Sequence, residues 1–293
     1  MRRRQQGAGL PEILVAMVLS LLVALVSATM LQAANSDFLH TGSASRMDDS
    51  GYFALSVMGQ AVRQAGYPGE PGAVPAASEG GTPPLAVAGR DASGVVRDAD
   101  GMGPPAPAVN GSDVLAIRYA PSATGAVGAG SAMLNCAGFP AGAGEWAWSI
   151  FYVARAGDGV AELRCKYKGG HAWAADAVVR GVDAFHVLYG IDTDSERDGI
   201  ANRYLTAGAL DALDDALPEP GRSQRLHWRR VVSVRIALLL HGEVGSRLGD
   251  KLASYALLPD ADPAARIDEA ALPIPMRHRA RRVFSATVAL RNP

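Results

Sequence analysis

The chain has 293 residues, of which 48% are hydrophobic, and its formal net charge at pH 7 is −1. This length and composition allow one sizeable core, and the balanced charge gives no global signal of a nucleic-acid-binding protein. The 33 glycines and 18 prolines indicate a fold rich in loops.

The first 31 residues carry the strongest signal. The basic stretch Arg2–Arg4 is followed by Gly7, then by the carboxylate of Glu12, and then by the uncharged apolar run Ile13–Leu31. A basic flank stays on the cytoplasmic side, and about 20 apolar residues span a ~30 Å hydrocarbon core. We therefore predict one crossing of the inner membrane, with the residues beyond about position 35 outside the cytoplasm.

Two ordinary interpretations of this segment compete. It could be a plain membrane anchor, or a cleaved secretory signal with its cleavage site near Ser27-Ala28-Thr29 or Gln32-Ala33-Ala34. Neither accounts for Glu12, because a carboxylate at the edge of a membrane segment is costly and usually marks a function.

The order of Gly7, Glu12 and the apolar run resembles the type III signal of type IV prepilins and pseudopilins. The resemblance implies that a prepilin peptidase cleaves between Gly7 and Ala8 and methylates the new N-terminus at Ala8. It also implies that Glu12 pairs with the terminal amine of a neighbouring subunit during assembly. Ala8 replaces the usual phenylalanine, and Pro11 replaces an apolar residue in a first helical turn, where proline is tolerated.

A long helix is expected to follow. Apolar residues recur at spacings of three and four over Leu55–Ala65, and Gly66-Tyr67-Pro68 ends the pattern. We predict a spine helix from about 8 to 66, with a possible break near 41–51.

Strands are expected beyond the spine helix, joined by Gly/Pro-rich surface loops of low order in the regions 68–112 and 121–145. A spine helix followed by an antiparallel sheet is an α+β, pilin-like fold class. The strand candidates are Asp113–Ala120, Trp146–Ala154, Val160–Lys168, Ala177–Tyr189, Val231–Leu240 and Arg282–Leu290.

These features divide the chain into four predicted parts. They are a leader peptide at 1–7, a transmembrane and filament-packing helix at 8–34, the periplasmic half of the spine helix at 35–67, and a β-rich head domain at 68–293.

Several segments resemble the PilW-type minor pilins of type IV pili. The matching segments are Gly51–Leu55, Arg63–Tyr67, Leu188–Asp194, Val231–Leu240 and Arg282–Asn292. The resemblance implies a structural subunit that primes pilus assembly at the inner membrane and sits at the pilus tip. The implied partners are other minor pilins, the major pilin, a tip adhesin, the prepilin peptidase and the inner-membrane assembly platform.

Two alternatives to a minor pilin remain open. One is a pseudopilin of type II secretion, similar to GspJ, which shares the leader and a similar layout. The other is a membrane-anchored periplasmic binding module, for which the leader resemblance would be a coincidence.

The chain has two cysteines, Cys136 and Cys165, both after the membrane segment. In an oxidising periplasm the expected state is one disulfide between them. No Cys-x-x-Cys motif and no histidine at ligand spacing points to a redox or metal role instead.

An acidic stretch near residue 195 offers a candidate weak calcium site. Its possible ligands are Asp192, Asp194, Glu196 and Asp198. The last three, with Gly199, match positions of a calcium-binding loop, but Leu205 stands where that loop has its bidentate glutamate. A solvated acidic turn is the favoured interpretation, and otherwise no cofactor is expected.

Two basic stretches, Arg222–Arg230 and Arg277–Arg282, could suggest nucleic-acid contacts, and Trp228 adds a stacking residue. A polar surface, or one that meets acidic partner subunits, is the favoured interpretation. No nucleophile elbow, paired histidine motif or phosphate loop is present, so we expect no enzymatic activity.

Overall fold

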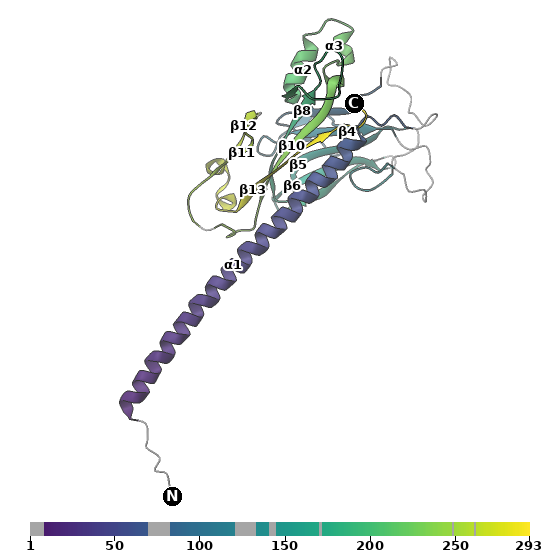
Figure 1. Cartoon of the computed structure of the whole chain (residues 1–293). Helices are drawn as coiled ribbons and strands as arrows, with labels where there is room; N and C mark the ends of the chain where they lie inside the picture. The colour runs from purple at the N-terminus through teal and green to yellow at the C-terminus, as the bar shows by residue number, and fades with distance from the viewer. Residues whose placement is uncertain are drawn as a thin grey trace. The chain divides into compact units, whose positions relative to one another are not determined.

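The computed structural model describes residues 9–69, 83–120, 133–140, 145–169, 172–247, 249–260 and 262–293. The expected leader and Ala8 lie outside these residues, as do parts of the two regions expected to be loops. The chain separates into two compact units, which we call the N-terminal unit (residues 1–46) and the C-terminal unit (residues 47–293) and describe separately (Figure 1).

One helix, α1 (Leu10–Gln64), runs for 55 residues without interruption (Figure 1). The possible break near 41–51 is therefore absent, because a single glycine at Gly42 costs a helix only about 1 kcal/mol. The helix ends two residues before Gly66, whose φ of +69° favours glycine and whose N–H donates to the Arg118 carbonyl at 3.0 Å.

Two antiparallel sheets form most of the C-terminal unit. The first sheet has the order β1-β4-β5-β6-β7, with strands β1 (Val87–Arg90), β4 (Val114–Tyr119), β5 (Ala147–Arg155), β6 (Ala161–Gly169) and β7 (Ala172–Arg180). The second has the order β13-β10-β8-β9, with strands β13 (Arg281–Ala289), β10 (Val231–His241), β8 (Val182–Ile191) and β9 (Arg203–Leu205). The predicted α+β class is confirmed.

Five of the six strand predictions agree with observed strands, but the prediction of one strand over Ala177–Tyr189 is wrong. The chain turns at Gly181, whose φ is +78°, so β7 ends at Arg180 and β8 begins at Val182. Gly181 stands between Arg180 and Val182, and Asp183 follows, but apolar residues on both sides of this short stretch made the segment read as one strand.

The core lies between the end of α1 and the two sheets. Ala54, Met58 and Val62 lie on one face of the helix and are fully buried together with Phe151 of β5 and Phe185 of β8. This burial explains the spacing of three and four over Leu55–Ala65, because only that helix face meets the sheets. Figure 1 shows the last turns of α1 beside the strands.

Several short elements were not expected from the sequence. The region 83–112, taken as loop, contains β1 and the two-residue strands β2 (Gly94–Val95) and β3 (Pro105–Ala106). The hairpin of β11 (Ser254–Leu258) and β12 (Asp262–Asp268) covers an apolar patch of the second sheet. The remaining elements are α2 (Ala207–Asp215), α3 (Gly221–Gln224), η1 (Trp228–Arg230), η2 (Glu269–Ala271) and η3 (Ile274–Met276).

Candidate assembly helix and acidic turn

The first half of α1 is an exposed apolar surface. The segment Leu10–Gln32 has a mean hydropathy of 2.6 and none of it is buried. Within the described residues it is the one helix long and apolar enough to cross a membrane, at roughly 35 Å for a rise of ~1.5 Å per residue. Side chains such as Leu10 and Leu21 are 80% and 72% exposed, so lipid or another protein must cover them.

Glu12 is the only charged residue of this apolar segment, and it caps the helix that carries it. The Gly9 N–H donates to Glu12 Oε2 at 3.0 Å, and the Gly9 carbonyl accepts the N–H of Glu12 at 3.0 Å. This is the return half of a capping box, with Pro11 in the first turn where its missing N–H is harmless. The bond is exposed, so a partner can replace it at little cost.

The polar side chains in the apolar segment are satisfied locally where the structure describes a bond. The Ser20 hydroxyl donates to the Ala16 carbonyl at 2.7 Å, and the Thr29 hydroxyl donates to the Val26 carbonyl at 2.8 Å. Hydrocarbon offers no other partner for such groups, so this arrangement suits a membrane. Gly7 and Ala8, the expected cleavage residues, lie outside the described residues.

The expected disulfide between Cys136 and Cys165 is present, with a Cα–Cα distance of 6.2 Å. Cys165 is a buried residue of β6, whereas Cys136 belongs to the segment 133–140. The Cys136 N–H also donates to the Ser149 hydroxyl at 3.1 Å. The disulfide and this bond fasten that segment to the first sheet.

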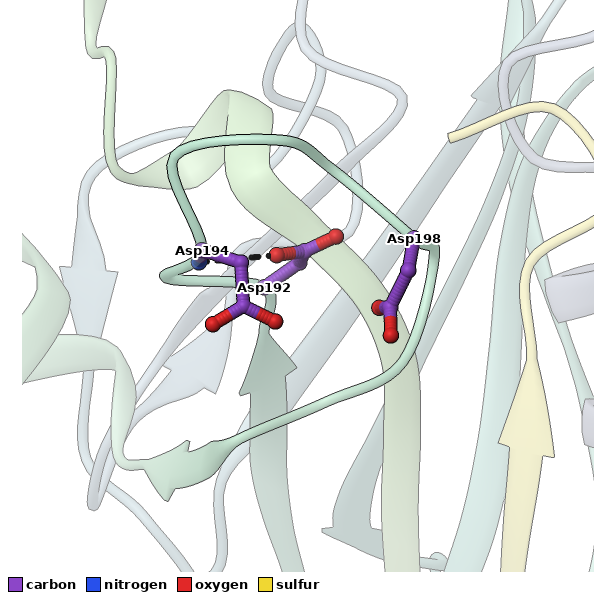
Figure 2. Close-up of side chains that lie close together, drawn as sticks. All are labelled: Asp192, Asp194 and Asp198. Carbon is purple, nitrogen blue, oxygen red and sulfur yellow. Dashed lines mark hydrogen bonds between the residues drawn. The ribbon is translucent and has the colours of Figure 1, made fainter.

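The acidic stretch folds into a turn that brings three carboxylates together, as Figure 2 shows. Oxygens of Asp192, Asp194 and Asp198 all lie within 4.8 Å of one another. Glu196 is not in this group, so the structure brings together three of the four expected ligands. The calcium-loop spacing assigned Asp194 to the first ligand position. In the structure β8 ends at Ile191, so the turn begins at Asp192, and this residue lies at its centre.

Asp192 holds this turn through backbone bonds. Its buried carboxylate accepts the N–H of Asp194 at 3.0 Å and of Gly199 at 2.9 Å. The bond from Gly199 contributes most to lowering the pKa of the Asp192 carboxyl, with the bond from Asp194 adding to it against the opposing effect of burial.

Asn202, which was not predicted as a site residue, closes the other side of the turn. Its Oδ1 accepts the Thr193 N–H at 2.6 Å, and its Nδ2 donates to Asp194 Oδ2 at 3.2 Å. The frequency of Asp, Asn and Gly in such turns was the available signal. Carboxylate oxygens suit calcium, but all three carboxylates of the turn already accept hydrogen bonds from its own backbone or from Asn202. These contacts favour a self-supporting acidic turn.

Several side chains of the first basic stretch form ion pairs or hydrogen bonds within the fold. Arg225 pairs with Asp211, and His227 Nδ1 lies 2.9 Å from the fully buried Asp214. Arg229 Nη2 donates to the Pro83 carbonyl at 2.6 Å. These contacts favour a structural role over nucleic-acid binding. The second stretch behaves similarly, with the Arg281 side chain fully buried between two carboxylates.

A long N-terminal helix with an exposed apolar first half, continuing into a unit of antiparallel sheets, defines a pilin-like α+β protein. Residues 150–292 match the family model described as "Type IV Pilus-assembly protein W", PilW. The resemblance to the PilW family is thereby confirmed for this part of the chain.

A search of solved structures finds the type IV-like pilin TTHA1219 from Thermus thermophilus. It is 16% identical, with a TM-score of 0.39, over 84% of this chain and 96% of that chain. A search of curated proteins finds no match.

Proposed function

We propose that the chain is a minor pilin that takes part in priming type IV pilus assembly at the inner membrane and sits at the pilus tip. One feature carries the proposal: an exposed, apolar membrane-length helix headed by a single carboxylate, in a chain whose residues 150–292 match PilW. The segment Leu10–Gln32 anchors the subunit, and the C-terminal unit lies in the periplasm.

The proposed mechanism is assembly by packing of helices, without catalysis. A prepilin peptidase cleaves between Gly7 and Ala8 and methylates Ala8. The apolar helix then enters a groove between the spine helices of other minor pilins or the major pilin. Each Å² of apolar surface buried there stabilises the assembly by about 25 cal/mol. Glu12 pairs with a neighbour's terminal amine there, and an unpaired carboxylate in that setting is expensive, which favours insertion in register. A tip adhesin and the inner-membrane assembly platform are the further partners.

Substitution at the head of the helix tests this proposal. We expect Glu12→Ala to abolish piliation and twitching motility, and a bulky substitution at Gly7 to block processing. Glu12→Gln separates charge from hydrogen bonding, because it retains an acceptor for the Gly9 N–H. The matched control is Ser20→Ala, which removes a polar group that bonds only its own helix in the structure. Normal piliation in both the Glu12→Ala and the Gly7 variants would exclude the proposal.

The alternatives give different phenotypes. A pseudopilin of type II secretion predicts loss of secretion with intact twitching motility when the gene is deleted. A membrane-anchored binding module predicts a chain that keeps its N-terminus and assembles into no filament.

A further inference from the structure

A pocket of about 280 Å³ lies in the C-terminal unit, between Gly66 and Pro68 after α1, the start of β1 and the last residues of the chain. Pro84, Ala86, Arg118, Trp146, Trp228 and Arg229 are among its lining residues. Among the residues that the structure describes, no aspartate or glutamate side chain lines it. The pocket therefore combines two guanidinium groups with an apolar wall, and its described lining holds no acidic side chain.

Arg118 and Trp146 lie on the same face of the first sheet. In the register of β4 and β5, Arg118 is directly opposite Trp148, and Trp146 precedes Trp148 by two residues. Side chains two residues apart along an extended chain share a face, so Trp146 is a diagonal neighbour of Arg118. The Arg118 guanidinium lies over the Trp148 ring, 3.7 Å from its centroid, which fixes its position.

The side chains of Arg118 and Trp146 both carry hydrogen-bond donors for which the described part of the chain supplies no acceptor. The Trp146 Nε1–H is buried and has no partner there. The Arg118 guanidinium makes no hydrogen bond or ion pair among those residues beyond its contact with the Trp148 ring. Burial lowers the pKa of Arg118 to about 10, against the opposing charge of Asp100. An unpaired buried donor such as the Trp146 indole is costly, and the half-buried Arg118 guanidinium has donors to spare, so both groups favour an incoming acceptor.

Arg229 adds a second, oriented positive charge. Its Nε donates to the Gln224 carbonyl at 2.8 Å and its Nη2 to the Pro83 carbonyl at 2.6 Å. Carbonyls orient the side chain without neutralising it, and no described aspartate or glutamate pairs with it. The ligand that balances such a site is an anion with an apolar stem.

We propose that this pocket binds a carboxylate carried by an apolar peptide segment of a neighbouring pilin subunit. The carboxylate accepts from Arg118 and Trp146, Arg229 adds attraction, and the apolar stem packs against Pro84 and Trp228. A carboxylate fits better than a phosphate because most of the lining is apolar. That a pilin subunit supplies the segment rests on the proposed function, whereas the ligand chemistry rests on the pocket alone.

Peptide binding to the full chain in detergent micelles tests the pocket without a pilus. The probe is acetyl-Leu-Glu-amide, with acetyl-Leu-Gln-amide and sodium acetate as comparisons. Affinity is measured by calorimetry, and the Trp146 indole N–H signal is followed by NMR. We expect saturable binding of the glutamate probe that shifts this signal, and weakening by about 10-fold or more in Arg118→Gln, because a charge-assisted bond is lost.

Trp146→Phe keeps an aromatic ring and should weaken binding without unfolding the sheet. The matched control is Arg155→Gln at the far end of β5, where an exposed arginine bonds Gly159, and it should leave affinity unchanged. Equal binding of the glutamine probe, no effect of Arg118→Gln or no saturable binding overturns the proposal. Acetate binding as tight as that of the peptide also overturns it, since the site would then take a free small anion. None of these results bears on the piliation test of Glu12, so the two proposals fail separately.

Discussion

At the scale of single residues, the most consequential arrangement is a buried charge network in the C-terminal unit. The Arg281 side chain is fully buried, and its guanidinium lies 2.7 Å from Asp183 and 2.8 Å from Glu269. His241 and Arg247 bind the other oxygens of these two carboxylates. The network ties the segment between β10 and β13 to the second sheet. Buried charges of this kind are stable only while every partner is present.

Removing the central charge should therefore destabilise the fold. We expect Arg281→Met to lower the free energy of unfolding by about 3–5 kcal/mol, because two buried carboxylates lose their shared partner. The neighbouring Arg282→Met is the control, since Arg282 is 54% exposed in its pair with Asp48 and such surface pairs contribute about 0–1 kcal/mol. Denaturant unfolding of both variants measures the difference, and equal losses would contradict the importance of the buried network.

The same network predicts sensitivity to acid. Burial by itself raises the pKa of Asp183 and of Glu269, but the bonds and positive charges around them outweigh burial, so both values are lowered. A carboxyl with a lowered folded-state pKa stabilises the fold above its unfolded pKa of about 4, and this stability disappears as the pH falls through the folded value. Unfolding followed between pH 7 and pH 2 should show a loss of stability below about pH 4. That loss should be smaller in Asp183→Asn. A variant whose stability falls with pH as steeply as that of the parent chain would contradict this role of the Asp183 carboxylate.

At the scale of elements, the contact between α1 and β13 depends on a glycine. A Cβ added at Gly51 would lie 2.6 Å from ring atoms of Phe284. Phe284 is 5% exposed and packs edge-on against Tyr52, with ring centroids 5.6 Å apart, so its ring has little room to move. Gly51 therefore allows the helix to approach the strand closely.

We expect Gly51→Ala to destabilise the C-terminal unit by about 1–3 kcal/mol, as overpacking of a core does. Gly42→Ala is the matched control in the same helix, because a Cβ there meets nothing within 4 Å and alanine favours a helix by up to about 1 kcal/mol. Thermal unfolding followed by near-UV circular dichroism should show a lower midpoint only for Gly51→Ala. A midpoint equal to that of the parent chain would contradict the close approach.

Periodicity decided which elements could be predicted from the sequence. The spacing over Leu55–Ala65 and the continuous apolar run of β10 each specify an element, because one face or both faces of that element are buried. Strands of two to four residues such as β2 and β3 are too short to carry a period. Gly181 divides the one strand expected over Ala177–Tyr189 into β7 and β8, and its positive φ makes the turn.

Some residues of the candidate site could likewise be predicted from the sequence, and others could not. Glu12 and the two cysteines could be identified from residue type and position, because a carboxylate beside an apolar run and a cysteine pair after it are unusual on their own. The role of Asp192 could not, because it depends on where β8 ends and on how the chain returns to bring Gly199 and Asn202 beside it. Tertiary contacts of this kind leave no local pattern.

At the scale of the whole molecule, the chain joins two units with different solvent requirements. The C-terminal unit buries its apolar side chains internally, whereas the N-terminal unit exposes nearly all of the apolar side chains of Leu10–Gln32. A chain built in this way is stable only with its first unit in lipid or packed on other helices. In a subunit that leaves the membrane to join a filament, lipid would cover this apolar helix before assembly and neighbouring helices would cover it afterwards.

The mass of the N-terminal peptide, measured on native protein from membrane and sheared-pilus fractions, tests this account most directly. The account predicts a chain that begins at N-methyl-Ala8 in both fractions. A chain that begins at Met1 in cells with an active prepilin peptidase would contradict it and would favour a simple anchored module.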